Sequence, residues 1–518
     1  MAAIGRRNLR TVLAKLIRKW FQKGNFRMTG FRPKALTGLF LGAGASYELG
    51  MPLVWELTAE IKNWLTPEKL RSLNQGWRSQ GNGFSDTVIN DLAAVLTIDN
   101  LHYESVLGHL ETQFKRQHNA SQEYHGLYSW LVALVYQLLY IRHTHNIQYI
   151  DQRLHHYEGI SVLSSQNSPL WIFSLNHDLI IEVIAARFSI PITCGFSPNV
   201  VTLPRRDASG MIQGELRAEV LMKHDLEHHA MYFPNPGKPG IHLLKIHGAL
   251  DVFTFNDGND LLKLIPDVPS TSGIIETLKA ANEELLYVDP RMPGGKVHAV
   301  NEIAYADEKG EMQFLRRSLL AGAYKYDTRR HQVLPQSLLK HFGANLNFVS
   351  RLVCIGYGFG DTHINSILRE WLEFHGERTL EIVSPTATIP SFLLHLAPQV
   401  SVVKRPATDH LDTLGGIKRS RRDELTKNIF FLCRERGKEN TNRDLSEFLR
   451  INNDRAIRLF AEKIKEMPFR NGDVDLRGIG EPDAVAKQLA KEINGEEIDM
   501  IERLHQFLQS KRCLLTPE

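Results

Sequence analysis

Four short segments of the sequence combine glycine with polar side chains that can bind or activate a ligand. The first, LGAGASYELG at 41–50, follows an apolar run. Glycine lets the backbone approach a phosphate closely, and a following helix offers free N–H groups at its positive dipole end. Strand, Gly-x-Gly turn and helix are typical of a dinucleotide pyrophosphate site, although a tight strand-to-helix connection has the same composition. The candidate binding residues are Gly42, Ala43, Gly44, Ala45 and Ser46.

The second and third segments supply an amide and an imidazole. In SLNHD at 174–178, Asn176 offers both a donor and an acceptor, so it can orient a ribose hydroxyl or a water molecule. Asp178 stands where a helix N-cap belongs, and we expect it to cap as well as to contribute to binding. In LKIHGALD at 244–251, His247 follows an apolar run and can act as a base near neutral pH. Taken alone, His247 also fits a structural histidine.

The fourth segment, CIGYGFGDTHIN at 354–365, interleaves glycines with aromatic residues and then adds polar side chains. Such a loop can close over a sugar or a base, with an aspartate accepting hydrogen bonds from ribose hydroxyls, or it can only cap the next helix. The candidate binding residues are Gly356, Tyr357, Gly358, Asp361, His363 and Asn365.

Short apolar runs without alternation precede these segments and recur along the chain, at 35–41, 169–174, 241–246, 351–356 and 380–383. This pattern is typical of strands buried on both faces of a parallel sheet. Helical patterns follow at 48–65, 178–188 and 362–374, which predicts an α/β fold with a doubly wound, Rossmann-like parallel sheet. Long helical stretches at 92–114 and 124–157 predict a helical insertion. Because ligands bind at the carboxyl ends of such strands, the four segments are expected to converge.

Together and in this order, the four segments resemble those of the sirtuin-like NAD-hydrolase effectors of prokaryotic anti-phage defence. That family shows a Gly-Ala-Gly-x-Ser loop, a Thr-x-Asn-Tyr-Asp-like segment, a Lys-x-His-Gly segment and a Gly-Tyr-x-Phe-x-Asp-x-His-Ile-Asn-like segment. This chain has LGAGAS, SLNHD, KIHG and GYGFGDTHIN, within about residues 35–410. It departs from the family at Ser174, where threonine is common, and at His177, where tyrosine is common.

The resemblance implies hydrolysis of NAD⁺ to nicotinamide and ADP-ribose, with NAD as the substrate and no metal. It places the pyrophosphate on 42–46, Asn176 on the attacking water and the ribose, and His247 as the general base. The residues of 356–365 would bind adenosine or ribose. The deacylase branch of the family carries an Asp-Phe-Arg element and a four-cysteine zinc module. This chain has Pro52-Leu53-Val54 and no cysteine cluster, which disfavours a protein deacylase or ADP-ribosyltransferase. A non-catalytic NAD or ADP-ribose sensor is the other alternative.

Composition limits the class of protein and its partners. The 518 residues include 62 Lys and Arg against 58 Asp and Glu, an excess too small to indicate nucleic-acid binding from charge alone. No apolar run reaches the roughly 18–20 residues that span a membrane. The pattern HDLEH at 224–228 fits a zinc peptidase, but its polar surroundings disfavour a metal site. The cysteines are dispersed, which disfavours disulfides and favours a cytoplasmic protein: Cys194, Cys354, Cys433 and Cys513.

The sequence predicts four parts: a basic amphipathic arm (1–34), a sirtuin-like NAD-binding domain with a helical insertion (35–413), a linker (414–422) and a helical C-terminal domain (423–518). The arm fits a transit peptide, a membrane-surface helix, a contact with another subunit or nucleic acid, or a helix that caps its own domain. The tail fits a helix-turn-helix broken near 452–453, or a packing and oligomerisation domain. A homo-oligomer with switched activity is expected. The resemblance allows a hexameric DNA-translocating ATPase, an Argonaute or a phage trigger protein as defence partner.

Overall fold

The computed structural model describes residues 36–116, 119–288, 297, 299–320, 322, 334–466, 469–470, 473–474, 488, 491 and 495–513. The chain divides into two compact units, residues 1–36 and residues 37–518. The predicted basic arm at 1–34 lies outside the described residues.

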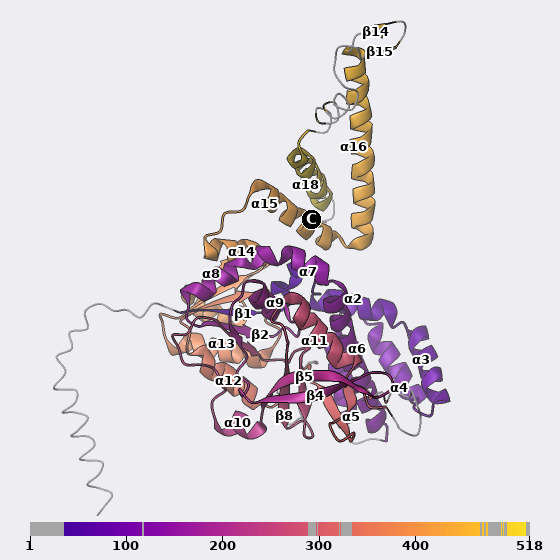
Figure 1. Ribbon diagram of the computed structural model, residues 1–518, viewed down its shortest axis with the longest axis vertical. Helices are drawn as coiled ribbons and strands as arrows, with labels where there is room; N and C mark the ends of the chain where they lie inside the picture. Colours follow the sequence, from indigo (N-terminus) through magenta and orange to yellow (C-terminus); the bar gives the residue numbers. More distant parts are fainter. Residues whose placement is uncertain are drawn as a thin grey trace, which may run out of the picture. The chain divides into compact units, whose positions relative to one another are not determined.

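Seven parallel strands form the central sheet, in the order β13-β12-β11-β1-β2-β6-β3 (Figure 1). All five predicted strands are present, and every residue of β2 is buried, as continuous apolar runs require. The doubly wound α/β fold is therefore confirmed. The strands are β1 (Thr37–Leu41), β2 (Leu170–Ser174), β3 (Ile192–Thr193), β6 (Ile241–Lys245), β11 (Arg351–Ile355), β12 (Thr379–Val383) and β13 (Val400–Val403).

The order of the strands defines a switch point between β1 and β11. From β1 the chain passes to β2 on one side, and after a long excursion it returns to β11 on the other side. At such a point the connections leave the sheet in opposite directions, which opens the space where α/β proteins bind ligands. The loops that follow β1 and β11 both lie there.

Helices cover the sheet, and the first one begins later than predicted. They are α2 (Val54–Trp64), α9 (Ile180–Arg187), α12 (Ser337–Leu346), α13 (Thr362–Phe374) and α14 (Ala407–Gly415). The predicted helix at 48–65 starts only at Val54, after two 3-10 turns at 43–45 and 47–49. Gly50 ends these turns with a left-handed φ of 95°, and Pro52 lacks the N–H that a continuing helix needs. No long helix therefore begins directly at the glycine loop.

The predicted helical insertion is present, as two groups of helices that follow α2 (Figure 1). The stretch at 124–157 is not one helix, because it is interrupted at Asn146 and ends in a 3-10 turn at 154–157. None of the described helices has the length and hydropathy needed to cross a membrane. The helices are α3 (Pro67–Ser79), α4 (Asp86–Leu96), α5 (Tyr103–Lys115), α6 (Ser121–His145), α7 (Ile147–Arg153) and α8 (Glu158–Gln166).

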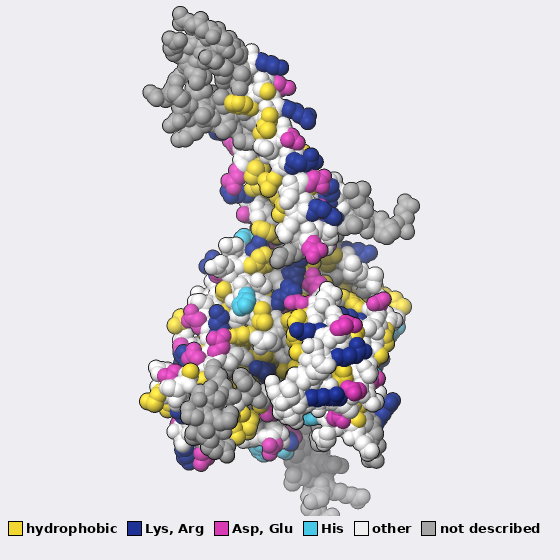
Figure 2. All heavy atoms as spheres, turned by 90° about the vertical axis from the view of Figure 1, so that its right-hand side faces the viewer, with side chains coloured by type: hydrophobic (Ala, Val, Ile, Leu, Met, Phe, Trp, Pro, Cys, Tyr) yellow, Lys and Arg dark blue, Asp and Glu magenta, His cyan; other side chains and the backbone are white. Residues whose placement is uncertain are grey.

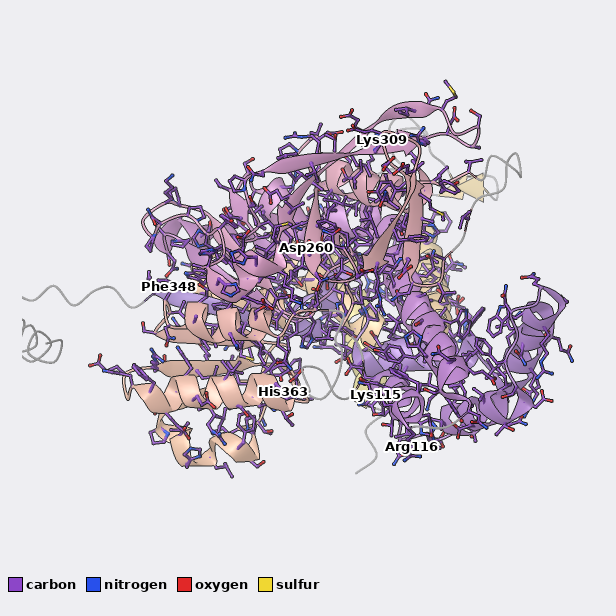
Figure 3. The ribbon with its side chains drawn as sticks, turned by 90° about the horizontal axis from the view of Figure 1, so that it is seen from below. Lys115, Arg116, Asp260, Lys309, Phe348 and His363 are labelled. Atoms are coloured by element: carbon purple, nitrogen blue, oxygen red, sulfur yellow. The ribbon has the colours of Figure 1, made fainter. Side chains whose placement is uncertain are left out.

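A second, antiparallel sheet was not predicted from the sequence. Its strand order is β4-β5-β8-β7-β10-β9, and it has its own core around Leu216, Phe253 and Leu262. Figure 3 labels Lys309 in the turn between its last two strands. The elements are β4 (Val200–Arg206), β5 (Ile212–Leu221), β7 (Val252–Phe255), β8 (Asp260–Ile265), β9 (Glu302–Ala306) and β10 (Met312–Arg317), with helices α10 (Lys223–His228) and α11 (Thr271–Glu283) between strands.

The C-terminal region is helical, with α15 (Arg421–Arg436), α16 (Lys438–Glu466) and α18 (Glu497–Cys513). The predicted break near 452–453 is wrong, because α16 runs through it without interruption. The sequence also predicts a helix at 482–510; residues 488, 491 and 495–510 of this range are described, and α18 covers it from Glu497 onward. α16 carries exposed Leu449 and Ile457, and Figure 2 shows hydrophobic, basic and acidic side chains mixed along this part of the surface. The helix-turn-helix alternative therefore loses its basis.

The predicted linker is short and held in place. α14 ends at Gly415, and α15 begins at Arg421 after the N-cap Ser420. Between them, the Arg419 guanidinium lies 2.7 Å from the Asp412 carboxylate and donates to the His155 carbonyl at 2.9 Å. The boundary between residues 413 and 423 as a division between domains stays a prediction.

Candidate functional site

The loops after β1 and β11 interlock through glycine. The Gly42 N–H donates to the Ile355 carbonyl, and the Gly44 N–H donates to the Gly356 carbonyl, both at 3.0 Å. A Cβ atom on Gly42 would lie 2.6 Å from the Gly356 carbonyl oxygen, and one on Gly44 would lie 2.7 Å from Gly356 Cα. Contacts this close exclude any side chain, so the glycines serve first to bring two backbone segments together.

The same hydrogen bonds limit how the glycine loop can hold a phosphate. Besides Gly42 and Gly44, the Ala45 N–H donates to the Gly42 carbonyl at 2.9 Å and the Ser46 N–H donates to the Ala43 carbonyl at 3.3 Å. Four of the five amides in 42–46 thus donate within the protein. A phosphate placed here would be held by the Ala43 N–H and the Ser46 hydroxyl rather than by the whole loop.

Asn176 is bonded directly to the glycine loop. Its side-chain amide donates to the Gly42 carbonyl at 2.9 Å and to Ser46 Oγ at 3.1 Å, and the side chain is buried. Ser174 helps to shape the turn, because its hydroxyl accepts from the Asn176 N–H at 3.1 Å. Both amide hydrogens of Asn176 are therefore used within the protein, which leaves Oδ1 as the atom that can accept a hydrogen bond from a ligand or a water.

His247 pairs with Asp361 across the sheet. His247 Nε2 lies 3.2 Å from Asp361 Oδ2, and both side chains are buried. The other oxygen, Oδ1, caps α13 by accepting from the N–H groups of His363 (3.0 Å) and Ile364 (3.2 Å). The sequence placed Asp361 on a ribose, whereas the structure places its carboxylate on the imidazole. A carboxylate in this position orients the ring for proton transfer.

Several other polar residues of 356–365 form hydrogen bonds with one another inside the loop. The Tyr357 hydroxyl lies 3.0 Å from Asn365 Oδ1 and accepts from the Asp361 N–H at 3.2 Å. Asn365 Nδ2 donates to the Phe359 carbonyl at 2.8 Å. Burial raises the pKa of Tyr357, so it stays a neutral phenol. Gly358 has open space around it, and the binding roles predicted for this loop stay predictions.

Figure 3 shows which end of the sheet these residues share. Phe348 precedes β11 and His363 follows it, and the two labels mark opposite ends of that strand. The four segments converge at the His363 end, because Asn176 contacts the loop after β1, that loop contacts Gly356, and Asp361 contacts His247. Asp178 is buried beside them, but the N-cap of α9 is Leu179, one residue later than expected; Asp178 Oδ1 still accepts from the N–H of Ile180, the first residue of the helix, at 3.1 Å.

Sequence reasoning missed two residues that support this site. Tyr157, in the 3-10 turn before α8, donates its hydroxyl hydrogen to the Ala45 carbonyl at 2.7 Å. Lys245 ends β6, and its ammonium donates to the carbonyls of Asn176 (3.4 Å) and Asp178. The KIHG segment contained a signal for Lys245, which ends the buried strand β6 two residues before His247. Nothing in the local sequence marked Tyr157.

Lys245 belongs to a buried cluster of four charges. Its Nζ lies 3.4 Å from a Glu182 carboxylate oxygen, and Lys263 Nζ lies 3.5 Å from the other oxygen of Glu182. Lys263 also bonds to Asp251. Burial alone would raise the pKa of Glu182, but the charges of Lys245 and Lys263 outweigh it and hold that pKa below its ordinary value. The cluster joins the turn after β2 to the ends of the strands that flank His247.

Helix α15 contacts the residues that follow the glycine loop. The Arg434 guanidinium lies 4.1 Å from the centre of the Tyr47 ring and 3.1 Å from a Glu56 oxygen. Glu48 accepts from the Thr408 N–H (3.0 Å) and hydroxyl (2.7 Å), and burial raises the pKa of Glu48. The C-terminal helices are thus connected through α14 and α15 to the backbone of the site.

The described residues contain no group of three or more His, Cys, Asp or Glu that could hold a metal ion. The histidines of the HDLEH pattern, His224 and His228, lie on α10 with their tilted rings 4.6 Å apart between centres, and the His228 Nδ1 lies 3.1 Å from the His224 carbonyl. The described residues therefore offer no support for the zinc-peptidase alternative.

Comparison with known proteins adds a distant structural likeness. No family model matches the chain, and no curated protein is significantly similar to it. Two mutants of a Sir2 homologue in complex with ADP-ribose are each 11% identical, with a TM-score of 0.32 over 73% of this chain and 90% of that chain. A Sir2 homologue–NAD complex is 10% identical, with a TM-score of 0.33 over 73% of this chain and 88% of that chain. TM-scores of this size carry no functional argument. Any inference about function therefore rests on the strand order and on the contacts within the site.

Proposed function

We propose that the protein is a sirtuin-like enzyme that hydrolyses NAD⁺ to nicotinamide and ADP-ribose. One observation carries the proposal: a continuous set of contacts joins the glycine loop, Asn176, His247 and Asp361 at the switch point of the sheet. Ligands of open α/β sheets bind at this point, and the residues gathered there supply acceptors and a potential base.

The reaction needs little acid catalysis, because the leaving group departs as neutral nicotinamide. The C–N glycosidic bond breaks with its electron pair passing to the pyridinium nitrogen, and positive charge develops on the ribose. A water oxygen forms the new bond to the anomeric carbon and loses a proton. Asn176 Oδ1 orients this water or a ribose hydroxyl, and His247, held by Asp361, accepts the proton. The Ala43 N–H and the Ser46 hydroxyl are the groups of the glycine loop that hold the pyrophosphate.

The test is release of nicotinamide from NAD⁺ by the purified protein, measured by chromatography. A positioned general base contributes about 10²–10⁴-fold to rate, so His247→Gln should lower turnover by that factor and leave NAD⁺ binding intact. Glutamine keeps a polar partner for Asp361. The matched control, His224→Gln on the exposed helix α10, should behave as wild type.

Two outcomes would contradict the proposal. If wild type binds NAD⁺ without releasing nicotinamide, and His247→Gln and Asn176→Ala respond as wild type does in cells, the sensor alternative is favoured. If radiolabel from NAD⁺ appears on a protein acceptor, or acyl groups are removed from one, the transferase and deacylase alternatives are favoured.

We propose further that hydrolysis is switched on during anti-phage defence in the cytoplasm and kills the infected cell by depleting NAD⁺. The contact of Arg434 with Tyr47 supports a switch, because it connects α15 of the C-terminal region to the residues that follow the glycine loop; Thr408 of α14 contacts the adjacent Glu48. Exposed Leu449 and Ile457 on α16 support self-association as its trigger. A phage protein, an Argonaute or a DNA-translocating ATPase would supply the signal. After phage infection, the NAD⁺ concentration should fall in cells that express the wild-type protein and not in cells that express His247→Gln. Equal NAD⁺ concentrations in the two kinds of cell would contradict the defence role.

A further inference from the structure

The turn that carries Asn176 is hydrogen-bonded to the buried ammonium of Lys245. In the register of the sheet, Lys245 at the end of β6 stands opposite Ser174 at the end of β2. The chain then turns away from β2, and Lys245 Nζ donates to the carbonyls of both Asn176 (3.4 Å) and Asp178. The Lys245 side chain is only 6% exposed, and its ammonium lies against these two carbonyls and the Glu182 carboxylate.

We propose that Lys245 is a positioning residue that sets the orientation of the Asn176 side chain. This inference rests on the proposed function and deepens it. Asn176 must place two amide hydrogens on two acceptors of the glycine loop, the Gly42 carbonyl and Ser46 Oγ, before its Oδ1 can point at a ligand. That geometry requires a fixed backbone at 176–178. Lys245 provides it by bridging two carbonyls of the same turn.

The charge of Lys245 also balances a buried cluster, and this second role must be separated from the first. Glu182 lies between the two ammonium groups, at 3.4 Å from Lys245 and 3.5 Å from Lys263, while Asp251 bonds to Lys263. Removal of Lys245 alone would leave an unbalanced buried carboxylate and destabilise the fold for that reason. A paired substitution removes this effect.

The experiment therefore compares two double variants, each of which removes one lysine and one acid from the cluster. Lys245→Met with Glu182→Gln loses the bridge to the two carbonyls. Lys263→Met with Asp251→Asn loses the same number of buried charges, but neither residue bonds to the turn. We expect both variants to unfold near the wild-type temperature. The first should lose about 10- to 100-fold in kcat, as small misplacements of catalytic groups do, with KM for NAD⁺ changed by less than about threefold. The second should keep wild-type kcat.

Hydrogen exchange at the backbone amides of 175–180, measured by mass spectrometry, gives a readout that does not depend on activity. Exchange there should be faster in the Lys245→Met, Glu182→Gln variant than in wild type, and unchanged in the other pair. The inference is overturned if both double variants retain wild-type kcat and exchange, or if both lose them equally. If wild type releases no nicotinamide, the proposed function fails, and the exchange data still decide whether Lys245 orders the turn.

Discussion

Substitution of Gly356 by alanine tests whether the two glycine loops must interlock. Gly356 has φ of +66°, a conformation that costs a residue with a side chain about 1–2 kcal/mol. The new Cβ would lie 2.4 Å from Ala45 N and from Gly44 Cα, where 3.4 Å is an ordinary contact, so the loops must separate by about 1 Å. Forcing extra volume into such a contact costs about 1–3 kcal/mol. The sum is about 2–5 kcal/mol.

Relief of this strain would pull the loop after β11 away from the loop after β1. If NAD⁺ binding requires the original geometry, about 2–5 kcal/mol is lost from the free energy of binding, which weakens Kd by about 30- to 4,000-fold. Isothermal titration with NAD⁺ and with ADP-ribose measures this change. The matched control is Gly358→Ala in the same loop, where nothing lies within 4 Å of the new Cβ. Wild-type affinity and thermal stability in Gly356→Ala would refute the reasoning.

Tyr157→Phe removes the hydrogen bond to the Ala45 carbonyl at 2.7 Å and should lower the free energy of unfolding by about 1 kcal/mol, measured by denaturant titration; no loss would mean that water replaces the hydroxyl. Asp361→Asn keeps an oxygen to cap α13 but removes the anion 3.2 Å from His247, so nicotinamide release should fall about 10²-fold with unchanged circular dichroism; equal rates would exclude the pair from catalysis. Burial lowers the pKa of His143 to about 4. Between pH 6.5 and 4 the unfolded chain therefore takes up a proton at His143 that the folded chain does not. The free energy of unfolding should fall by up to about 3 kcal/mol as the pH decreases through this range. A His143→Gln variant should show a flatter pH profile, and an identical profile would contradict the assignment.

Much of the parallel sheet could be predicted, because its signals are local. Each buried strand is a continuous apolar run, as at 170–174, and each polar segment directly follows its strand in the chain. The antiparallel sheet was missed although β5 (212–221) alternates exposed and buried residues over 215–218. The break predicted near 452–453 failed because two asparagines on an exposed helix cost little against the continuous hydrogen bonds of α16.

The partners within the site could not be predicted, because they depend on the order of the strands in space. Asp361 and His247 are more than a hundred residues apart in the chain, and β1 and β2 separate β11 from β6 in the sheet. The two side chains meet only because the loops that follow β11 and β6 approach each other at the carboxyl ends of the strands. Tyr157 and Ala45, and likewise Asn176 and Gly42, are also remote from each other in the sequence and are hydrogen-bonded only in the folded structure.

The sequence by itself determined where the strands end and which polar groups stand there, since both are properties of short, contiguous segments. Only the tertiary structure decided that the glycines bring the loops after β1 and β11 together. It also decided that both side-chain amide hydrogens of Asn176 are donated to the loop after β1, and that the carboxylate of Asp361 lies beside the imidazole of His247. Those assignments follow from distances between segments remote in sequence, which the packing of the sheet sets.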